Sequence, residues 1–83
     1  MGDYMKRRVY QSAEGKHVKM EVLARYKFAG EDAGISLTKG VIYDCVGYDK
    51  ELGLIRIVDD TEEDYLFKLD NFELIEDFRK EII

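Results

Sequence analysis

The sequence predicts a mainly β fold: a small barrel of about five short antiparallel strands, with an N-terminal arm and a short C-terminal helix. Apolar and polar side chains alternate along residues 18–26, which is typical of a half-buried strand. After this segment, short runs rich in β-branched and aromatic residues recur between Gly- and Asp-containing connections. The length of 83 residues leaves room for a single core.

The predicted strands follow one another closely along the chain. Residues 29–34 are a loop by composition, and Gly40 is expected to take a positive φ in a turn with Lys39. Residues 59–64 are expected to form an acidic turn, and Arg56 is expected on the wet face of its strand. The predicted strands are residues 18–26, 35–37, 41–48, 54–58 and 65–67.

The N-terminal residues have no clean hydrophobic period, and we expect them to form an arm or a loose hairpin. Val9 and Tyr10 are the candidates for a short strand on an edge. The chain therefore divides into an arm at residues 1–17, a barrel at residues 18–76 and a tail at residues 77–83.

The spacing of the apolar residues changes in the tail of the chain. Leu74, Phe78 and Ile82 are spaced four residues apart with charged side chains between them, a pattern that predicts an amphipathic helix. We expect this stripe to pack on the barrel of a monomer. If it is exposed instead, it is the candidate surface for a weak homodimer.

The net charge of −5 is unevenly distributed. Residues 1–20 carry a charge of +3, and residues 21–83 carry −8. An acidic body repels phosphate backbones, so we expect no nucleic-acid partner. The basic N-terminal residues are expected to be solvated, although they could touch an anionic partner.

Compartment signals are few. Cys45 is the single cysteine, so no internal disulfide can form. Lys6, Arg7 and Arg8 interrupt any apolar run of signal-peptide length, and no segment approaches the roughly 20 apolar residues of a membrane span. We therefore expect a cytoplasmic protein without membrane contact.

The sequence shows no combination of base, nucleophile and anion-binding groups and no known catalytic motif. We therefore expect no catalytic residue, metal site or cofactor. Residues 59–64 hold five carboxylates, but their spacing fits no calcium loop, so a solvated tip is expected. A Cys–His nucleophile needs both side chains within hydrogen-bond reach. Cys45 is expected to be a small core thiol and His17 to be exposed.

Several segments occur in the order of a known barrel family. Residues 24–28 read ARYKF where that family has A-L-Y-D-Y, and residues 29–34 fill the place of its long acidic loop. Residues 35–40 read ISLTKG in place of L-S-F-x-K-G, and residues 65–72 cover the G-Y-I-P strand and the short 3₁₀ turn. On these motifs, residues 20–76 resemble the Src-homology-3 (SH3) barrel, most closely the bacterial SH3-like domains.

The resemblance implies a protein-binding groove, which in this family receives polyproline on aromatic side chains. The chain has no tryptophan and no proline, so Leu54 or Ile55 stands near the place of the groove tryptophan and Phe67 near that of the groove proline. We therefore do not expect a classical polyproline ligand. Acidic loop side chains would meet a basic group of the partner. The candidate partner-binding residues are Tyr26, Phe28, Glu31, Asp32, Leu54, Phe67 and Phe72.

The sequence thus predicts a non-enzymatic protein-interaction module whose partner is another protein or a peptide. The alternative is an acidic inhibitor or immunity-type protein that masks a basic toxin or enzyme. Binding would then be sensitive to salt and centred on residues 59–64.

Overall fold

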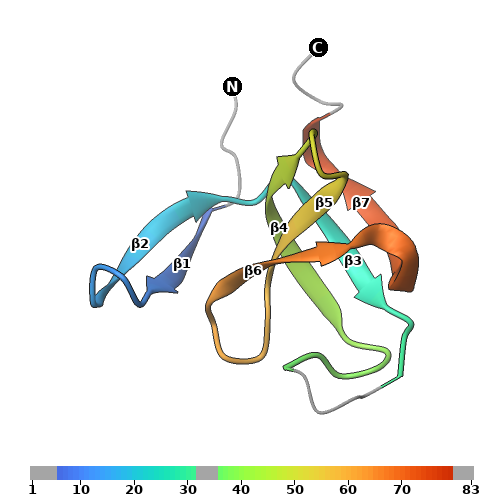
Figure 1. Ribbon diagram of the computed structural model, residues 1–83, viewed down its shortest axis with the longest axis horizontal. Helices are drawn as coiled ribbons and strands as arrows, with labels where there is room; N and C mark the ends of the chain where they lie inside the picture. The colour runs from blue at the N-terminus through green and yellow to red at the C-terminus, as the bar shows by residue number, and fades with distance from the viewer. Residues whose placement is uncertain (1–5, 32–35, 80–83) are drawn as a thin grey trace.

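The computed structural model describes residues 6–31 and 36–79. The chain is mainly β, with seven strands and one 3₁₀ turn in these ranges (Figure 1). The elements are β1 (Lys6–Gln11), β2 (Lys16–Glu21), β3 (Ala24–Phe28), β4 (Ile42–Asp49), β5 (Leu54–Val58), β6 (Asp64–Lys68), η1 (Leu69–Asn71) and β7 (Phe72–Asp77). The strands predicted at residues 41–48, 54–58 and 65–67 are confirmed as β4, β5 and β6.

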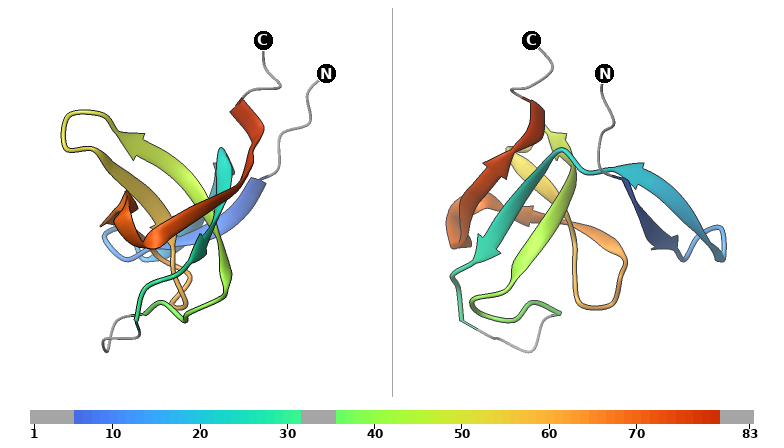
Figure 2. Two further views of the ribbon diagram at one scale, coloured as in Figure 1. Left: turned by 90° about the vertical axis from the view of Figure 1, so that its right-hand side faces the viewer. Right: turned by 180° about the vertical axis from the view of Figure 1, so that it is seen from behind.

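Five of the strands form one antiparallel sheet in the order β6-β5-β4-β3-β7. The last strand returns to pair with β3, in register from Ala24 opposite Asp77 to Phe28 opposite Phe72. The sheet curls strongly (Figure 2), but no ladder joins its outer strands β6 and β7 in the described residues. The predicted closed barrel is therefore corrected to a curled sheet with two outer edges.

The N-terminal residues form a hairpin. β1 and β2 pair as a separate two-stranded sheet that projects from the side of the larger one (Figure 1). The single strand predicted over residues 18–26 is wrong, because the chain leaves β2 at Glu21 and enters the other sheet at Ala24. The linking Leu23 donates its N–H to the carbonyl of Cys45 at 2.8 Å, which fixes the crossing between the sheets.

Two apolar clusters stabilise these sheets. The main core lies inside the curl and is built on the alternating buried side chains of β3. A second, smaller cluster joins the hairpin to the sheet through Val9, Val46 and Val58, with Met20 packed against it. The buried members of the main core are Ala24, Tyr26, Phe28, Leu37, Tyr43, Cys45, Ile55 and Ile57.

A β-bulge in strand β4 places consecutive side chains in both apolar clusters. Cys45 lies opposite Ile57 and Gly47 lies opposite Arg56, so Val46 is an extra residue between them. Cys45 belongs to the main core and Val46 to the hairpin cluster, although they are neighbours in sequence. β4 is therefore buried on both of its faces at this point.

Polar contacts also attach the hairpin. The Asp44 carboxylate accepts from Arg7 at 3.0 Å and from Arg25 at 3.1 Å, so it links β1 with β3 and β4. Gln11 donates to Asp64 at 3.0 Å. The backbone N–H of Tyr10 donates to the carbonyl of residue 62 at 2.9 Å. These partners lie far apart in sequence, so the hairpin belongs to the folded unit.

The C-terminal helix predicted from Leu74, Phe78 and Ile82 is wrong for the described residues. Residues 72–77 form the edge strand β7, and Ile82 lies outside the described part of the chain. The ladder with β3 satisfies the backbone of β7 along one edge, and this tertiary pairing overrides the helical spacing. The expected 3₁₀ turn at residues 69–71 is confirmed.

The short strand predicted at residues 35–37 is not formed by its described members. Leu37 is buried in the main core but belongs to no strand, and Ile35 lies outside the described residues. Gly40 takes a φ of 87°, as predicted, and donates its N–H to the carbonyl of Phe28 at 2.8 Å. The loop is therefore attached to the end of β3 without becoming a strand.

We predict that Val9→Ala lowers the free energy of unfolding by about 2 kcal/mol, because it removes two buried methyl groups from the cluster that attaches the hairpin. Urea unfolding measures this loss. Val41→Ala is the matched control at an exposed position, and its effect should stay within about 0.5 kcal/mol. Equal losses in the two variants would contradict a buried role for Val9.

Candidate functional site

The aromatic residues predicted to form a binding groove lie mostly in the core. Tyr26 is 6 % exposed and Phe28 is 3 % exposed. The partly buried Phe72 packs over them, with ring centroids 6.3 Å from Tyr26 and 5.4 Å from Phe28. Phe67 is 6.0 Å from Phe72 on its other side. The structure therefore brings these four rings together, but as a packed cluster that presents little open aromatic surface.

The acidic loop of the predicted groove is only partly described. Glu31 is exposed and forms an ion pair with Lys39 at 3.3 Å. An exposed pair of this kind contributes little to stability and is easily exchanged for an outside partner. Asp32 lies outside the described residues.

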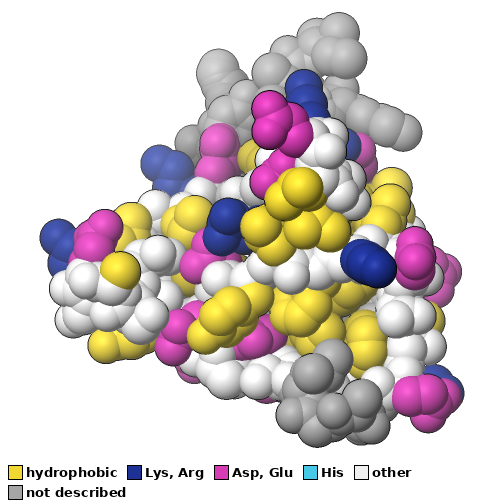
Figure 3. Space-filling view, viewed as in Figure 1, with side chains coloured by type: hydrophobic (Ala, Val, Ile, Leu, Met, Phe, Trp, Pro, Cys, Tyr) yellow, Lys and Arg dark blue, Asp and Glu magenta, His cyan; other side chains and the backbone are white. Residues whose placement is uncertain are grey.

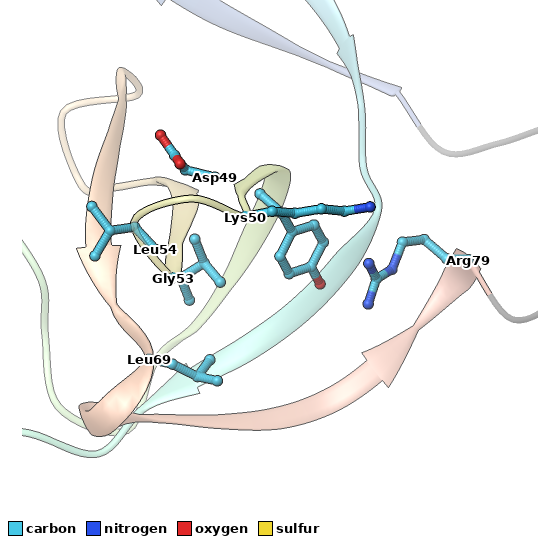
Figure 4. A pocket seen from close by; sticks show the side chains of 8 residues that line it. Asp49, Lys50, Gly53, Leu54, Leu69 and Arg79 are labelled. Atoms are coloured by element: carbon cyan, nitrogen blue, oxygen red, sulfur yellow. The ribbon is translucent and has the colours of Figure 1, made fainter.

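A pocket of about 240 Å³ lies beside the turn between β4 and β5. Leu54 and Leu69 lie toward one side of it and Arg79 toward the other, while the Lys50 side chain extends toward Arg79 (Figure 4). Three segments that are distant in sequence therefore build one hollow. The lining residues are Tyr48, Asp49, Lys50, Gly53, Leu54, Ile55, Leu69 and Arg79.

Tyr48 forms the aromatic wall of this pocket. Its hydroxyl shares a hydrogen bond with the Tyr26 hydroxyl at 3.1 Å, and the Arg79 guanidinium lies 4.1 Å from its ring centroid. Burial, assisted by the hydrogen bond to Tyr26, raises the pKa of Tyr48 well above its usual range. Tyr48 is therefore a neutral, fixed wall at ordinary pH.

Positive charge gathers at the rim. Asp77 holds Arg79 by accepting from Nε at 3.2 Å and from Nη2 at 3.1 Å, which orients the guanidinium over Tyr48. Lys50 has no carboxylate partner among residues 6–31 and 36–79. The Asp49 carboxylate is used locally, since it accepts from the backbone N–H of Leu52 at 3.0 Å. The rim can therefore receive an anionic or carbonyl oxygen next to apolar walls.

Hydrophobic side chains also gather on the surface over β5 and β6 (Figure 3). The exposed apolar residues near this surface include Leu52, Tyr65 and Leu69, at 66 %, 47 % and 46 % exposure. Leu69 is shared with the pocket. The apolar area around the hollow is thus larger than its lining alone.

Sequence reasoning found the lining residue Leu54, with Ile55 as the alternative at the same place. It predicted Tyr26 as a groove residue, whereas the structure places the Tyr26 hydroxyl against Tyr48. It missed Tyr48, Lys50, Leu69 and Arg79, which lie at the end of a strand, in a turn, in the 3₁₀ turn and beyond β7. No periodic pattern connects these positions, so only the tertiary structure brings them together.

The acidic segment at residues 59–64 is less solvated than predicted. Asp59 is buried and accepts from the N–H and hydroxyl of Thr61. Asp60 accepts from Tyr43 and Thr38, each at 2.9 Å. Asp64 binds both Gln11 and Arg56, and Glu63 accepts from the Tyr65 hydroxyl at 2.9 Å. Four of its five carboxylates therefore have partners inside the molecule.

Cys45 and His17 lie in different sheets. Cys45 is fully buried in the main core, and its Sγ donates to the carbonyl of Gly47 at 3.2 Å. His17 is exposed on β2, where its ring packs edge-on against Tyr10 at 5.2 Å. In the described ranges, no group of three or more His, Cys, Asp or Glu side chains is placed to hold a metal ion. Nor do those ranges contain a helix of the length and hydropathy that a membrane crossing requires.

Comparison of the chain with protein-family models, curated proteins and solved structures finds no match. The functional argument therefore rests on the topology and on the surfaces described above.

We predict that the Cys45 thiol is inert in the folded protein. Burial raises its pKa and leaves no exposed sulfur for a reagent. Ellman's reagent should label the native protein far more slowly than the protein unfolded in urea. Rapid labelling of the native state would show that the thiol is accessible and would reopen a nucleophilic role.

We predict that stability falls at alkaline pH. The folded state holds the Tyr48 proton more tightly than the unfolded chain, whose tyrosines have the ordinary pKa of 10.0. Stability is therefore unaffected by this group below pH 10 and decreases as the pH rises above it, by up to about 1.4 kcal/mol per pH unit. Urea unfolding between about pH 8 and about pH 11 measures the slope.

The Tyr48→Phe variant is the control for this alkaline loss. Tyr43 and Cys45 also have raised pKa values through burial, so part of the alkaline loss remains in the variant. A smaller slope than in the wild type is expected. An unchanged slope would mean that Tyr48 ionises normally in the folded state.

Proposed function

We propose that this chain is a non-enzymatic protein-interaction domain with an SH3-like strand arrangement, which binds a segment of a partner protein at the pocket beside the β4–β5 turn. The observation that carries this proposal is the combination of apolar walls and a cationic rim in one hollow. Small-molecule and peptide sites typically combine an apolar surface with a few directed polar groups.

The strand order supports the SH3-like arrangement. Five antiparallel strands follow one another around the sheet, and the 3₁₀ turn precedes a last strand that pairs with the first of the five. This is the order of segments that the sequence resemblance implies. Fold alone does not define function, so the partner has to be argued from the surface.

The lining of the pocket favours a partner segment in which an apolar side chain is followed by a carboxylate or carbonyl group. An apolar side chain of the partner would enter between Leu54, Leu69 and the Tyr48 ring. Lys50 and Arg79 would then face a carboxylate or carbonyl of the same segment. The packed ring cluster around Phe72 offers no open trough, so we propose no polyproline ligand.

The acidic inhibitor is the alternative, and the structure gives it less support. Salt-sensitive masking was expected to centre on residues 59–64. Four of the five carboxylates there are engaged in internal hydrogen bonds, and using them for a partner would break contacts that hold the hairpin and the loops. We therefore rank the interaction pocket first.

We predict that Leu69→Glu abolishes capture of a specific partner from cell lysate, because it places a charged side chain on an apolar wall of the pocket. Leu52→Glu is the matched control, since Leu52 is more exposed, lies close in space to the turn and is not part of the lining. Capture at low and high salt, followed by mass spectrometry, is the measurement.

The salt dependence separates the two functions. A partner lost with Leu69→Glu and retained with Leu52→Glu supports the pocket. A partner that both variants retain and that high salt releases supports charge masking instead. Loss in both variants would indicate general damage to the surface rather than a pocket.

A further inference from the structure

The outer face of the N-terminal hairpin carries a second feature, which the pocket does not explain. Alternate residues of a strand point to opposite faces. The inner face presents Val9, Val18 and Met20 to the body of the protein, where Val9 is buried. The outer face therefore presents the other set of side chains. Its members are Lys6, Arg8 and Tyr10 from β1 and His17, Lys19 and Glu21 from β2.

Two cations lie directly opposite each other on this outer face. The register places Arg8 opposite Lys19, and both side chains are exposed. Like charges at directly opposed positions destabilise a sheet. Lys6 lies opposite Glu21, so the one carboxylate on this face is beside a different cation. No carboxylate within residues 6–31 and 36–79 forms an ion pair with Arg8 or Lys19.

Two other cations of the hairpin, in contrast to Arg8 and Lys19, have carboxylate partners. Arg7 is paired with Asp44 at 3.0 Å, and Lys16 with Glu14 at 3.9 Å. The body of the protein is also acidic, with a charge of −8 over residues 21–83. Carboxylates are therefore abundant in the chain, yet none within residues 6–31 and 36–79 forms an ion pair with Arg8 or Lys19. An anionic partner would remove this repulsion when it binds.

The same hairpin has a free backbone edge. Within residues 6–31 and 36–79, β2 pairs with β1 alone, and the right-hand view of Figure 2 shows the hairpin projecting to one side of the larger sheet. The far edge of β1 is different, because Tyr10 bridges to Glu63 there. Along β2, alternate N–H and C=O groups therefore point away from β1 and can pair with an added strand.

We propose that the free edge of β2 binds an extended acidic peptide segment of a partner protein, whose carboxylates at alternate positions face Lys19 and Arg8. Pairing along β2 fixes the segment as a strand, and every second side chain then lies on the cationic face. Lys19 is on the strand that the segment would join, and Arg8 lies opposite it on β1, on the same face of the hairpin. This surface is separate from the pocket, so the two proposals stand independently.

A nucleic acid fits these observations less well. The pair of half-buried Tyr10 and exposed His17 could stack on a base, but the acidic body repels a long polyanion over about 8 Å in physiological salt. A free strand edge also gives ladder hydrogen bonds to a peptide backbone and none to a sugar-phosphate chain. Lysine on an edge can also serve to discourage aggregation. The two lysines of β2, Lys16 and Lys19, are sufficient to discourage aggregation at its edge. Protection of the edge therefore does not explain why Arg8 lies opposite Lys19 on β1.

The test is an NMR titration of the full chain labelled with ¹⁵N, using a synthetic peptide of alternating Glu and Thr, eight residues long. The expected result is a set of shift changes confined to β1 and β2, with binding weakened by salt. The double variant Arg8→Gln/Lys19→Gln should bind about tenfold more weakly. Lys16→Gln is the matched control, because it removes a cation from the inner face of the same strand.

Two further probes make the outcome decisive. A peptide of the same sequence with every backbone amide N-methylated lacks the N–H donors of a ladder and should not bind, which tests the added strand. An eight-residue deoxythymidine oligonucleotide tests the other class of polyanion. Tighter binding of that oligonucleotide, equal weakening by Lys16→Gln, retained binding of the N-methylated peptide, or no binding of the Glu-Thr peptide at millimolar concentration would each overturn the proposal.

Discussion

Burial of β4 and β5 on both faces is the constraint on which the rest of this structure depends. Cys45 and Val46 are consecutive, as are Ile57 and Val58, and all four are buried. Each pair sends one side chain into the curled sheet and the other into the cluster beneath the hairpin. A small sheet exposed on that second face would leave valines in water, at a cost of about 1.5–3 kcal/mol for each large apolar side chain. The hairpin is therefore needed to complete the fold.

The same constraint explains where the charges lie. The inner face of the hairpin is used for packing and for the contacts to Asp44 and Asp64, and Lys16 is its one further cation. The other cations of the two strands, Lys6, Arg8 and Lys19, lie on the outer face. Acidic groups are also used in internal contacts, since Asp60 accepts hydrogen bonds from Tyr43 and from the loop residue Thr38. The net charge of −5 therefore does not show which charged groups on the surface are without an internal partner. The distribution of unpaired groups decides which surfaces can bind.

The local sequence pattern was sufficient to predict β4, β5 and β6 of the large sheet and the buried Cys45, because these segments are rich in β-branched and aromatic residues. It failed where tertiary pairing decides. β7 is an edge strand with Leu74 and Ile75 exposed on opposite faces, so it shows no alternation, and the spacing of Leu74 and Phe78 resembled a helix. The strand β1 also lacks a clean pattern, since Val9 is its one buried residue and the neighbours on the same face, Arg7 and Gln11, are polar. The pocket could be predicted only through Leu54, because its other walls come from segments that no local pattern connects.

The packed aromatic cluster has a consequence for the kind of interaction domain that this chain can be. In a groove domain, aromatic faces are exposed and receive the ligand directly. Here Phe72 closes over Tyr26 and Phe28, and the Tyr26 hydroxyl is directed to Tyr48 rather than to solvent. These rings therefore stabilise the core, and the open pocket lies elsewhere, beside the β4–β5 turn. In the function that we propose, binding at this pocket depends on how Asp77 positions Arg79 over Tyr48, so specificity rests on a preformed ion pair and a neutral ring.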